Sequence, residues 1–391
     1  MGKELPKNNY IYFDYAATTP VDQRVLLAME PYWYKVYGNP SSLHLKGREA
    51  KVVLDDCRRL VADFLNAKER NVYFTAGGTE SDNLALLGYL KNFDEPKRIV
   101  ISDIEHKAVV RVAEHLEREG WKVERCPVDL NGLIDEEQLE KLIDEDTVLV
   151  SIIYANNEIG VVQDIAKLSK IIKDKNAKTV FHTDACQATN FLNMNVEDLG
   201  VDLLSFSASK IYGPKGVGVL YANDNLKLGP MIWGGGQEKG MRSGTENIPG
   251  IVGMCEAIKI VEKIKDAENR RLFLLREKLI SGILNTIDGV HINGDRKKCL
   301  PNIINISVEG VEGESMVLYL DEAGFGVSTG SACSVLDLKP SSVLLALGMS
   351  EELAHCSLRI SLGRYSSEEG VDSFLEIFPK IVERIRKFSA V

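Results

Sequence analysis

Short β-rich runs alternate with helical patterns between about residues 70 and 222, and this alternation is what most constrains the fold. Between the runs, apolar residues recur at helical spacing, as at Ile165, Leu168, Ile171 and Ile172. The expected strands span residues 71–74, 98–102, 148–153, 179–183, 203–207 and 217–221. Strands that alternate with helices are typical of an α/β fold, so we predict a mostly parallel sheet here.

The rest of the chain predicts a second, smaller unit. Residues 248–284 carry many charges and no proline after Pro249, which favours one long helix bridging two domains. A chain of 391 residues is long enough for about two domains. Strands are expected near residues 302–308 and 357–362, ahead of a last helix opened by a Ser366-x-x-Glu369 capping box. This pattern indicates an α+β arrangement.

Composition excludes several classes of protein. Hydrophobic residues make up 45% and charged residues 27%, which is typical of a globular chain. No apolar run approaches the ~18–20 residues that a membrane span needs. The net charge of −10 argues against a nonspecific nucleic-acid surface. The first nine residues contain no apolar signal region, so a cytoplasmic protein is expected.

The seven cysteines are scattered and form no Cys-x-x-Cys pair. Neither a disulfide framework nor a zinc ribbon is therefore expected. His182 and Cys186 are four residues apart, but no second pair completes a metal site, so no metal is predicted. Cys57, Cys126 and Cys255 fall within apolar patterns and are interpreted as core thiols.

A segment with two glycines, Phe74-Thr-Ala-Gly-Gly-Thr-Glu-Ser-Asp-Asn83, follows one expected strand and precedes a helical pattern. Gly78 and Thr79 at such a turn, together with free helix N–H groups, can cradle a phosphate. The segment matches neither the P-loop nor G-x-G-x-x-G, so a nucleoside triphosphate is not implied. A tight turn with Thr79 as a plain N-cap explains the segment equally well.

Two further segments follow strands of the expected sheet. Asp184 and Gln187 come at the end of the run 179–183, and the carboxyl ends of such strands are where open α/β sheets bind ligands. Lys210 follows the run 203–207 after the two small residues Ala208 and Ser209. A lysine desolvated there would have a lowered pKa and could form a Schiff base. A solvated surface lysine is the commoner case for any single position.

Two residues of the C-terminal third also stand out. Cys333 lies in Ser328-Thr-Gly-Ser-Ala-Cys-Ser334, a run of small residues that indicates either an exposed, mobile thiol loop or an ordinary turn. Arg359 is a charge within a short strand pattern, so it either pairs with a core acid or binds a carboxylate ligand.

Together these segments resemble the cysteine desulfurases, pyridoxal-phosphate enzymes of the class V aminotransferase group within the fold type I family. The similarity runs almost end to end, and the order and spacing of its motifs are specific. The motifs are residues 12–20, Gly38-Asn-Pro-Ser-Ser-Leu-His44, Glu105-His-Lys-Ala108, Asn156-Asn-Glu-Ile-Gly160, the Lys210 segment, Gly240-Met-Arg-Ser-Gly-Thr245 and the Cys333 loop. The resemblance implies a large α/β cofactor domain of residues 15–260. It also implies a small α+β domain of residues 1–14 plus 261–391, which carries the cysteine loop.

The resemblance also implies roles for individual residues. Lys210 would hold pyridoxal 5'-phosphate and move the substrate's α-proton, His106 would stack on the pyridine ring and assist, and Asp184 would pair with the ring nitrogen. The remaining implied contacts are Asn157 and Gln187 near the phenolic oxygen; Gly78, Thr79, Ser207 and Ser209 at the phosphate; Thr245 from the partner subunit; and Arg359 and Asn39 at the substrate carboxylate. Cys333 would receive the sulfur.

The chain departs from the family pattern at two places. Position 209 is Ser where the family commonly has His, which puts one phosphate contact in doubt. The cysteine loop continues as Cys-Ser-Val-Leu-Asp instead of Cys-Ser-Ser-Gly, which puts its flexibility and acceptor in doubt. Its Gly-Ser-Ala-Cys-Ser part resembles the housekeeping and nitrogen-fixation group.

The function that the resemblance implies is the conversion of L-cysteine to L-alanine, with a persulfide left on Cys333. The implied partners are a second copy of the chain and an iron–sulfur scaffold protein or another sulfur acceptor. Two alternatives stay open: a selenocysteine lyase or other class V aminotransferase, and a scaffold without cofactor that only docks iron–sulfur assembly proteins. An aminotransferase would not need the thiol of Cys333, and the set of Lys210, Asp184 and His106 argues against a scaffold.

Overall fold

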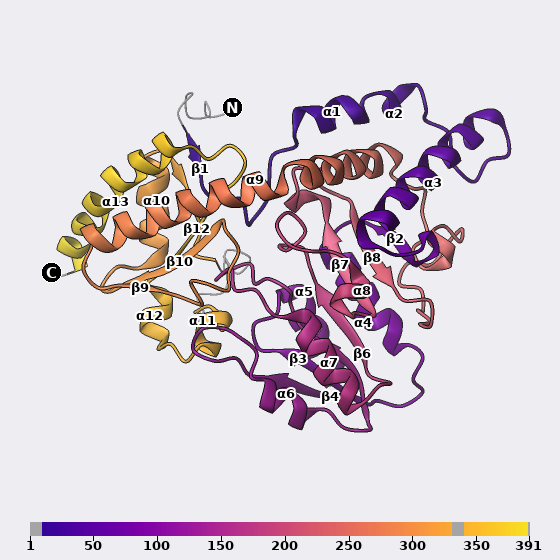
Figure 1. Ribbon diagram of the computed structural model, residues 1–391, viewed down its shortest axis with the longest axis horizontal. Helices are drawn as coiled ribbons and strands as arrows, with labels where there is room; N and C mark the ends of the chain where they lie inside the picture. Colours follow the sequence, from indigo (N-terminus) through magenta and orange to yellow (C-terminus); the bar gives the residue numbers. More distant parts are fainter. Residues whose placement is uncertain (1–9, 331–339, 390–391) are drawn as a thin grey trace.

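A seven-stranded sheet forms the centre of the larger part of the molecule (Figure 1). The computed structural model describes residues 10–330 and 340–389. The sheet order is β2 (Val72–Thr75), β8 (Gly218–Ala222), β7 (Leu203–Ser207), β6 (Val180–Asp184), β5 (Thr147–Ser151), β3 (Arg98–Ser102) and β4 (Lys122–Cys126). The pairings from β7 to β4 are parallel, whereas β8 runs antiparallel to both β7 and β2. The predicted α/β fold with a mostly parallel sheet is confirmed.

Helices cover this sheet and continue beyond it. The N-terminal and sheet-associated helices are α1 (Gln23–Met29), α2 (Pro31–Tyr34), α3 (Leu45–Leu65), α4 (Gly78–Leu90), α5 (Lys107–Arg118), α6 (Glu136–Leu142), α7 (Ile165–Lys175) and α8 (Val196–Leu199). The later helices are α9 (Ile248–Thr286), α10 (Gly313–Glu322), α11 (Ser342–Ala346), α12 (Glu351–His355) and α13 (Glu368–Ser389). The long predicted helix is α9, which packs against α1 and α3 at one end and against α13 at the other (Figure 1).

A smaller sheet lies beside α13, with strand order β12 (Ser357–Ser361), β10 (Ile303–Val308) and β9 (Val290–Ile292), all antiparallel. The N-terminal β1 (Ile11–Tyr12) pairs in parallel with β11 (Phe325–Gly326). Directly after β1, Asp14 forms a single bridge with Ser361 of β12. Residues 11–14 therefore pair with strands of the C-terminal third of the chain.

Two local predictions need correction. The edge strand β4 was missed because its Lys-Val-Glu-Arg-Cys sequence is largely polar, as an edge strand tolerates. The capping box at Ser366 is wrong by one residue: Ser367 Oγ accepts the N–H of Gly370 at 3.1 Å, whereas Ser366 Oγ accepts the N–H of Gly363. Both bonds tighten the turn that leads into α13.

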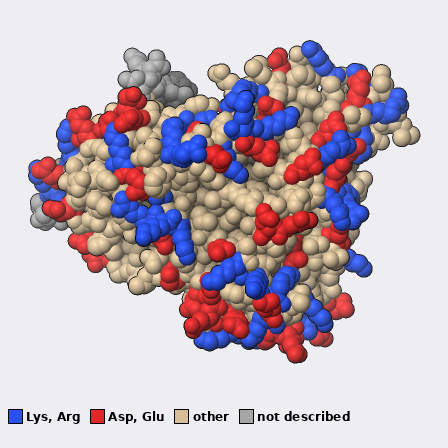
Figure 2. All heavy atoms as spheres, in the orientation of Figure 1, with Lys and Arg blue, Asp and Glu red and all other residues tan. Residues whose placement is uncertain are grey.

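The surface of the molecule is charged, and the helices that the structure describes lack long apolar segments, as the composition of the sequence predicts. Acidic and basic side chains are interspersed over the face drawn in Figure 2. Within residues 10–330 and 340–389, no helix combines the length and the apolar character needed to span a bilayer.

Candidate active site

Several of the predicted site residues lie where the parallel strands end. Asp184 is the last residue of β6, and Ser207 is the last of β7. A short 3-10 helix, Ala208–Lys210, follows β7 at once and turns the lysine back across the sheet edge. The β2–α4 turn with Gly78 reaches the same edge, since β2 joins the sheet through β8. This is the edge at which α/β sheets bind ligands.

The amine of Lys210 is held by the N-terminal segment of the chain. Its Nζ donates to the carbonyl oxygens of Ala16 and Ala17, both at 2.7 Å. Burial lowers the pKa of this amine, and the nearby Arg359 guanidinium acts in the same direction. A lowered pKa increases the fraction of neutral amine, which is the form that can add to a carbonyl group.

A buried acid–imidazole cluster lies near this lysine. Ligand atoms of Asp82, His106 and Asp184 all lie within 4.8 Å of one another. Asp184 accepts the backbone N–H of Cys186 at 2.8 Å. Oδ1 of Asp82 has no hydrogen-bond partner among the described residues, and burial raises the pKa of its carboxyl group well above the usual range. Asp82, on α4, is a site residue that sequence reasoning missed.

His106 occupies the N-cap of α5. Its Nδ1 accepts the backbone N–H of Ala108 at 3.1 Å, so the neutral ring carries its proton on Nε2. Burial lowers the pKa of the imidazole, although Asp184 opposes this shift. A neutral imidazole with one proton at a fixed nitrogen is suited to proton transfer at neutral pH.

The glycine turn before α4 has the features of an anion cradle. The N-cap of α4 is Gly77, at φ 151°. Because glycine has no side chain, the N-cap residue does not bond to the first N–H groups of the helix. A Cβ at Gly78 would lie 2.5 Å from Sγ of Cys186, so only glycine fits there. Across the turn, the hydroxyl oxygens of Ser207 and Ser209 lie 3.0 Å apart. Free N–H groups and paired hydroxyls are typical of phosphate sites.

The consecutive residues Asn156 and Asn157 differ in role. Asn156 is buried and structural: its Oδ1 accepts two backbone N–H groups and its Nδ2 donates to Ile104 O. Asn157 contributes its carbonyl oxygen to Nη1 of Arg359 at 2.9 Å. Gln187 donates from Nε2 to Ala16 O, the same carbonyl that receives Lys210.

Arg359 is buried and paired with an acid, the first of the two possibilities that its strand position left open. Its Nη2 lies 2.6 Å from Oδ1 of Asp14. Its Nε has no partner among the described residues. A guanidinium carries five N–H donors, so this pair does not exhaust its capacity for a second carboxylate.

Two predicted site residues are not brought to this edge within one chain. Asn39 uses its side chain within its own loop, accepting the N–H of Ser41 at 2.9 Å. In Figure 1 that loop, between α2 and α3, lies on the right, away from β12, the strand that contains Arg359. Thr245 is exposed, in the loop before α9. Cys333 lies outside the described residues.

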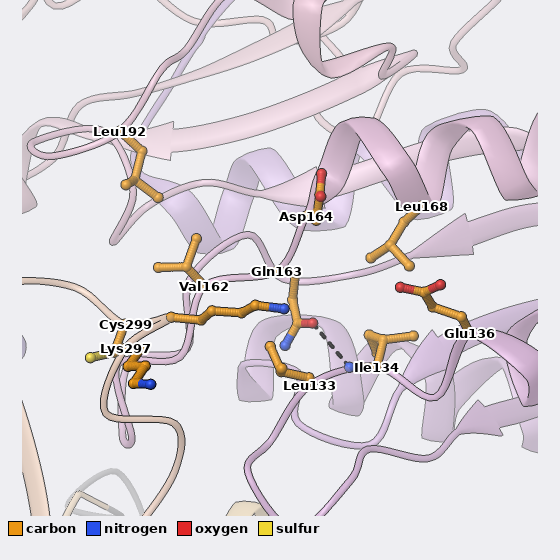
Figure 3. A pocket seen from close by; sticks show the side chains of 11 residues that line it. Leu133, Ile134, Glu136, Val162, Gln163, Asp164, Leu168, Leu192, Lys297 and Cys299 are labelled. Carbon is orange, nitrogen blue, oxygen red and sulfur yellow. Dashed lines mark hydrogen bonds between the residues drawn. The ribbon is translucent and has the colours of Figure 1, made fainter.

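A separate pocket of about 370 Å³ lies between α6, α7 and residues 297–299 (Figure 3). At its centre, Oε1 of Gln163 accepts the N–H of Ile134 at 3.0 Å, and Nε2 donates to Gly132 O. Both polar ends of the amide are thus satisfied by the protein. Of the predicted site residues that the structure describes, none lines this pocket.

Comparison with known proteins gives one consistent result. The model of the family described as aminotransferase class-V matches residues 11–374. Cysteine desulfurase IscS 1 of Archaeoglobus fulgidus is 46% identical, over 97% of this chain and 98% of the relative. Cysteine desulfurase IscS of Dictyoglomus turgidum is 45% identical, over 97% and 96%.

Solved structures agree with these relatives. A structure titled NifS-like protein has a TM-score of 0.90 and 39% identity, over 96% of this chain and all of the other. A structure titled SspA in complex with cysteine has a TM-score of 0.81 and 35% identity, over 91% of this chain and all of the other. The chain therefore belongs to the class-V aminotransferase family and, within it, to the cysteine desulfurases, which depend on pyridoxal phosphate.

Proposed function

We propose that this protein converts L-cysteine to L-alanine and keeps the sulfur atom as a persulfide on Cys333. In the sulfur-transfer step, the Cys333 sulfur bonds to the substrate sulfur, the substrate's carbon–sulfur bond breaks, and the β-carbon gains a proton. The observation that carries this proposal is the buried Lys210 amine beside the cluster of Asp82, His106 and Asp184. A thiolate is required for the attack, because a neutral thiol is a poor nucleophile.

The residues of the strand-end edge fit pyridoxal phosphate in chemistry. Lys210 supplies a buried amine, Asp184 a carboxylate for the ring nitrogen, and the turn at Gly78 a cradle that a Cβ would fill. When bound, the cofactor withdraws electrons from the substrate's α-carbon. The proposed phosphate contacts are Gly78, Thr79, Ser207, Ser209 and, from the partner subunit, Thr245, and the proposed contacts of the phenolic oxygen are Asn157 and Gln187.

The protein's own groups are proposed to handle the protons and the substrate carboxylate. Lys210 would move the α-proton because its pKa is lowered by burial. His106, with its proton on Nε2, would assist. Arg359 would bind the substrate carboxylate, for which its planar guanidinium is suited.

We further propose that the active unit is a homodimer. Thr245 is exposed, and the loop between α2 and α3 that contains Asn39 lies away from β12, the strand of Arg359 (Figure 1), which supports a role for both residues in a neighbouring subunit. Large apolar side chains are exposed on the segment that contains α1–α3: Leu26, Leu27, Trp33, Tyr34, Tyr37, Leu43, Leu45 and Val52. An apolar surface of this kind marks an interaction site, and we assign it to a second copy of the chain.

The persulfide is proposed to pass to an iron–sulfur scaffold protein or another sulfur acceptor in the cytoplasm. This proposal is supported by the Gly-Ser-Ala-Cys-Ser sequence around Cys333. The proposed boundaries, residues 15–260 for the large domain and 1–14 plus 261–391 for the small one, put the cysteine loop in the small domain.

The test is to incubate the purified, cofactor-loaded protein with L-cysteine and a thiol reductant. We expect sulfide and alanine in equal amounts, and none of either from the Cys333→Ser variant. Alanine formed at the wild-type rate by Cys333→Ser would favour a lyase or aminotransferase that does not use the thiol. A colourless protein that binds no cofactor and forms neither product would favour a docking scaffold.

A further inference from the structure

Asp14 and Arg359 form a buried ion pair at the edge of the candidate site. Nη2 of Arg359 lies 2.6 Å from Oδ1 of Asp14, and the two side chains are only 4% and 18% exposed. On its other side, Nη1 of Arg359 donates to Asn157 O at 2.9 Å. The guanidinium is thus bound on two sides, by the carboxylate of Asp14 in the N-terminal segment and by the carbonyl oxygen of Asn157 in the loop after β5.

The backbone of Asp14 is anchored beside the strand that carries Arg359. It bridges to Ser361 of β12, two residues beyond Arg359 on the same strand. The hydroxyl of Tyr12 donates to the backbone oxygen of Asp14 at 2.8 Å. The backbone of Arg359 pairs with Ser328, which stands five residues before Cys333. The Cα atoms of both members of the ion pair are therefore fixed by backbone pairing.

The pair leaves donors of Arg359 without an acceptor. Two of the five N–H groups have partners, and Nε is buried with none among the described residues. Buried donors are nearly always satisfied, so this unsatisfied edge of the guanidinium points to an acceptor that residues 10–330 and 340–389 do not supply. A carboxylate matches the fork of a guanidinium.

We propose that Asp14 is a positioning residue: it holds the guanidinium of Arg359 in the orientation that receives the carboxylate of the substrate. The inference rests on the proposed function, in which Arg359 binds that carboxylate. Without the charge-assisted bond to Asp14, the guanidinium is held by one carbonyl alone and turns away from its bound orientation. Asp14 thereby acts on substrate affinity through Arg359.

The test compares Asp14→Asn with Asp22→Asn. Asp22 is the matched control, because its carboxylate also pairs with an arginine of the C-terminal third, Arg364, at 2.6 Å. For each cofactor-loaded variant, the change in cofactor absorbance is titrated with L-alanine and, separately, with cysteamine, which is cysteine without its carboxylate. Thermal unfolding and cofactor content confirm that each variant is folded.

For Asp14→Asn we expect about a tenfold higher half-saturating concentration of L-alanine, a similar rise in KM for L-cysteine, and unchanged titration with cysteamine. Asp22→Asn should match the wild type in all three. In an Arg359→Lys background, where the fork is already lost, Asp14→Asn should add little.

Three results would overturn the proposal. The first is tighter L-alanine binding by Asp14→Asn, which would make Asp14 a competitor of the substrate carboxylate. The second is a loss of cysteamine affinity as large as the loss of L-alanine affinity. The third is that Asp14→Asn lowers L-alanine affinity as much in the Arg359→Lys background as in the wild type. If Asp14→Asn does not fold, Asp14→Glu, which keeps the carboxylate, is expected to retain most of the L-alanine affinity, and the loss of that affinity would contradict the proposal. Failure of the wild type to release sulfide would instead refute the proposed function.

Discussion

At the level of single residues, the Lys210 amine is held by carbonyl oxygens, and within residues 10–330 and 340–389 no carboxylate forms an ion pair with it. Its Nζ contacts Ala16 O and Ala17 O, which accept hydrogen bonds without adding a full negative charge. Carbonyl oxygens stabilise the ammonium less than a carboxylate would, and burial further lowers the pKa. The site therefore keeps Lys210 available as a nucleophile and a base.

This arrangement predicts where the cofactor is attached. Borohydride reduction of the loaded enzyme should leave the cofactor on the peptide that contains Lys210, as read by mass spectrometry after digestion. Lys210→Ala should lower turnover at least about a hundredfold, because the group that moves the proton is gone. Attachment to the neighbouring Lys215, whose Nζ bonds to Thr19 O instead, would show that the wrong lysine has been assigned.

Residues that follow strands could be predicted from the sequence, and those that the tertiary fold brings in could not. Asp184 comes directly after the expected strand 179–183 and Lys210 comes three residues after the expected strand 203–207, so their position at the sheet edge follows from the alternation of elements. Asp82 lies in the polar run 79–83, which has the composition of a surface helix. Its burial arises only because α4 packs against β6 and β7. Asp14 finds Arg359 across 345 residues of chain.

At the scale of elements, Glu105 links the end of β3 to the strand beside it. Its Oε1 accepts the hydroxyl of Ser102 and, at 2.6 Å, the N–H of Ile153, just after β5. Its Oε2 is buried without a partner among the described residues. Burial raises the pKa of Glu105 from 4.5 to about 8. The next residue, His106, is the N-cap of α5, so Glu105 joins the ends of β3 and β5 directly before this helix starts.

The shift predicts a pH dependence of stability. Below pH 4.5 the carboxyl is protonated in both the folded and the unfolded chain. Between 4.5 and about 8 only the unfolded chain ionises it, so the free energy of unfolding falls as pH rises through this window. Glu105→Gln should remove this part of the dependence.

Urea unfolding at pH 5 and pH 8.5 tests this prediction. The gain in stability of Glu105→Gln over the wild type should increase between the two values, by on the order of a few kcal/mol. The exposed Glu145→Gln serves as the control and should follow the wild type. Parallel curves for the wild type and Glu105→Gln would mean that Glu105 stays ionised in the folded protein.

Element boundaries show a similar division between local and tertiary information. The range of β3 and β7 follows from runs of apolar residues, since strands buried on both faces need no alternation. The edge strand β4 has no such run, and its pairing with β3 in parallel register determines it instead. The N-cap bond from Gly370 to Ser367 depends on which of two neighbouring serines faces α13. Sequence spacing alone does not decide between them.

At the scale of the whole molecule, the exposed apolar segment of α1–α3 predicts dimerisation. Leu27 and Trp33 are 68% and 64% exposed. The double variant Leu27→Glu, Trp33→Glu should run as a monomer in size-exclusion chromatography with light scattering, because charges cannot be buried unpaired at an interface. It should also lose cofactor, since Thr245 would no longer reach a neighbour's phosphate.

Leu318→Glu on α10 is the matched control, because this leucine is 70% exposed on another part of the molecule. It should stay dimeric and keep its cofactor. A monomeric wild type that binds cofactor and turns over at full rate would remove both the dimer and the role of Thr245 from the account.

One thiol, Cys333, is proposed to carry the sulfur between the cofactor site and the acceptor. To locate the sulfur, the loaded wild-type enzyme is reacted with L-cysteine without reductant and quenched, and the persulfide is mapped by mass spectrometry of its peptides. We expect one extra sulfur atom on the peptide that contains Cys333. An extra sulfur on Cys186 or Cys356 instead, or wild-type turnover by Cys333→Ala, would show that Cys333 is not the carrier.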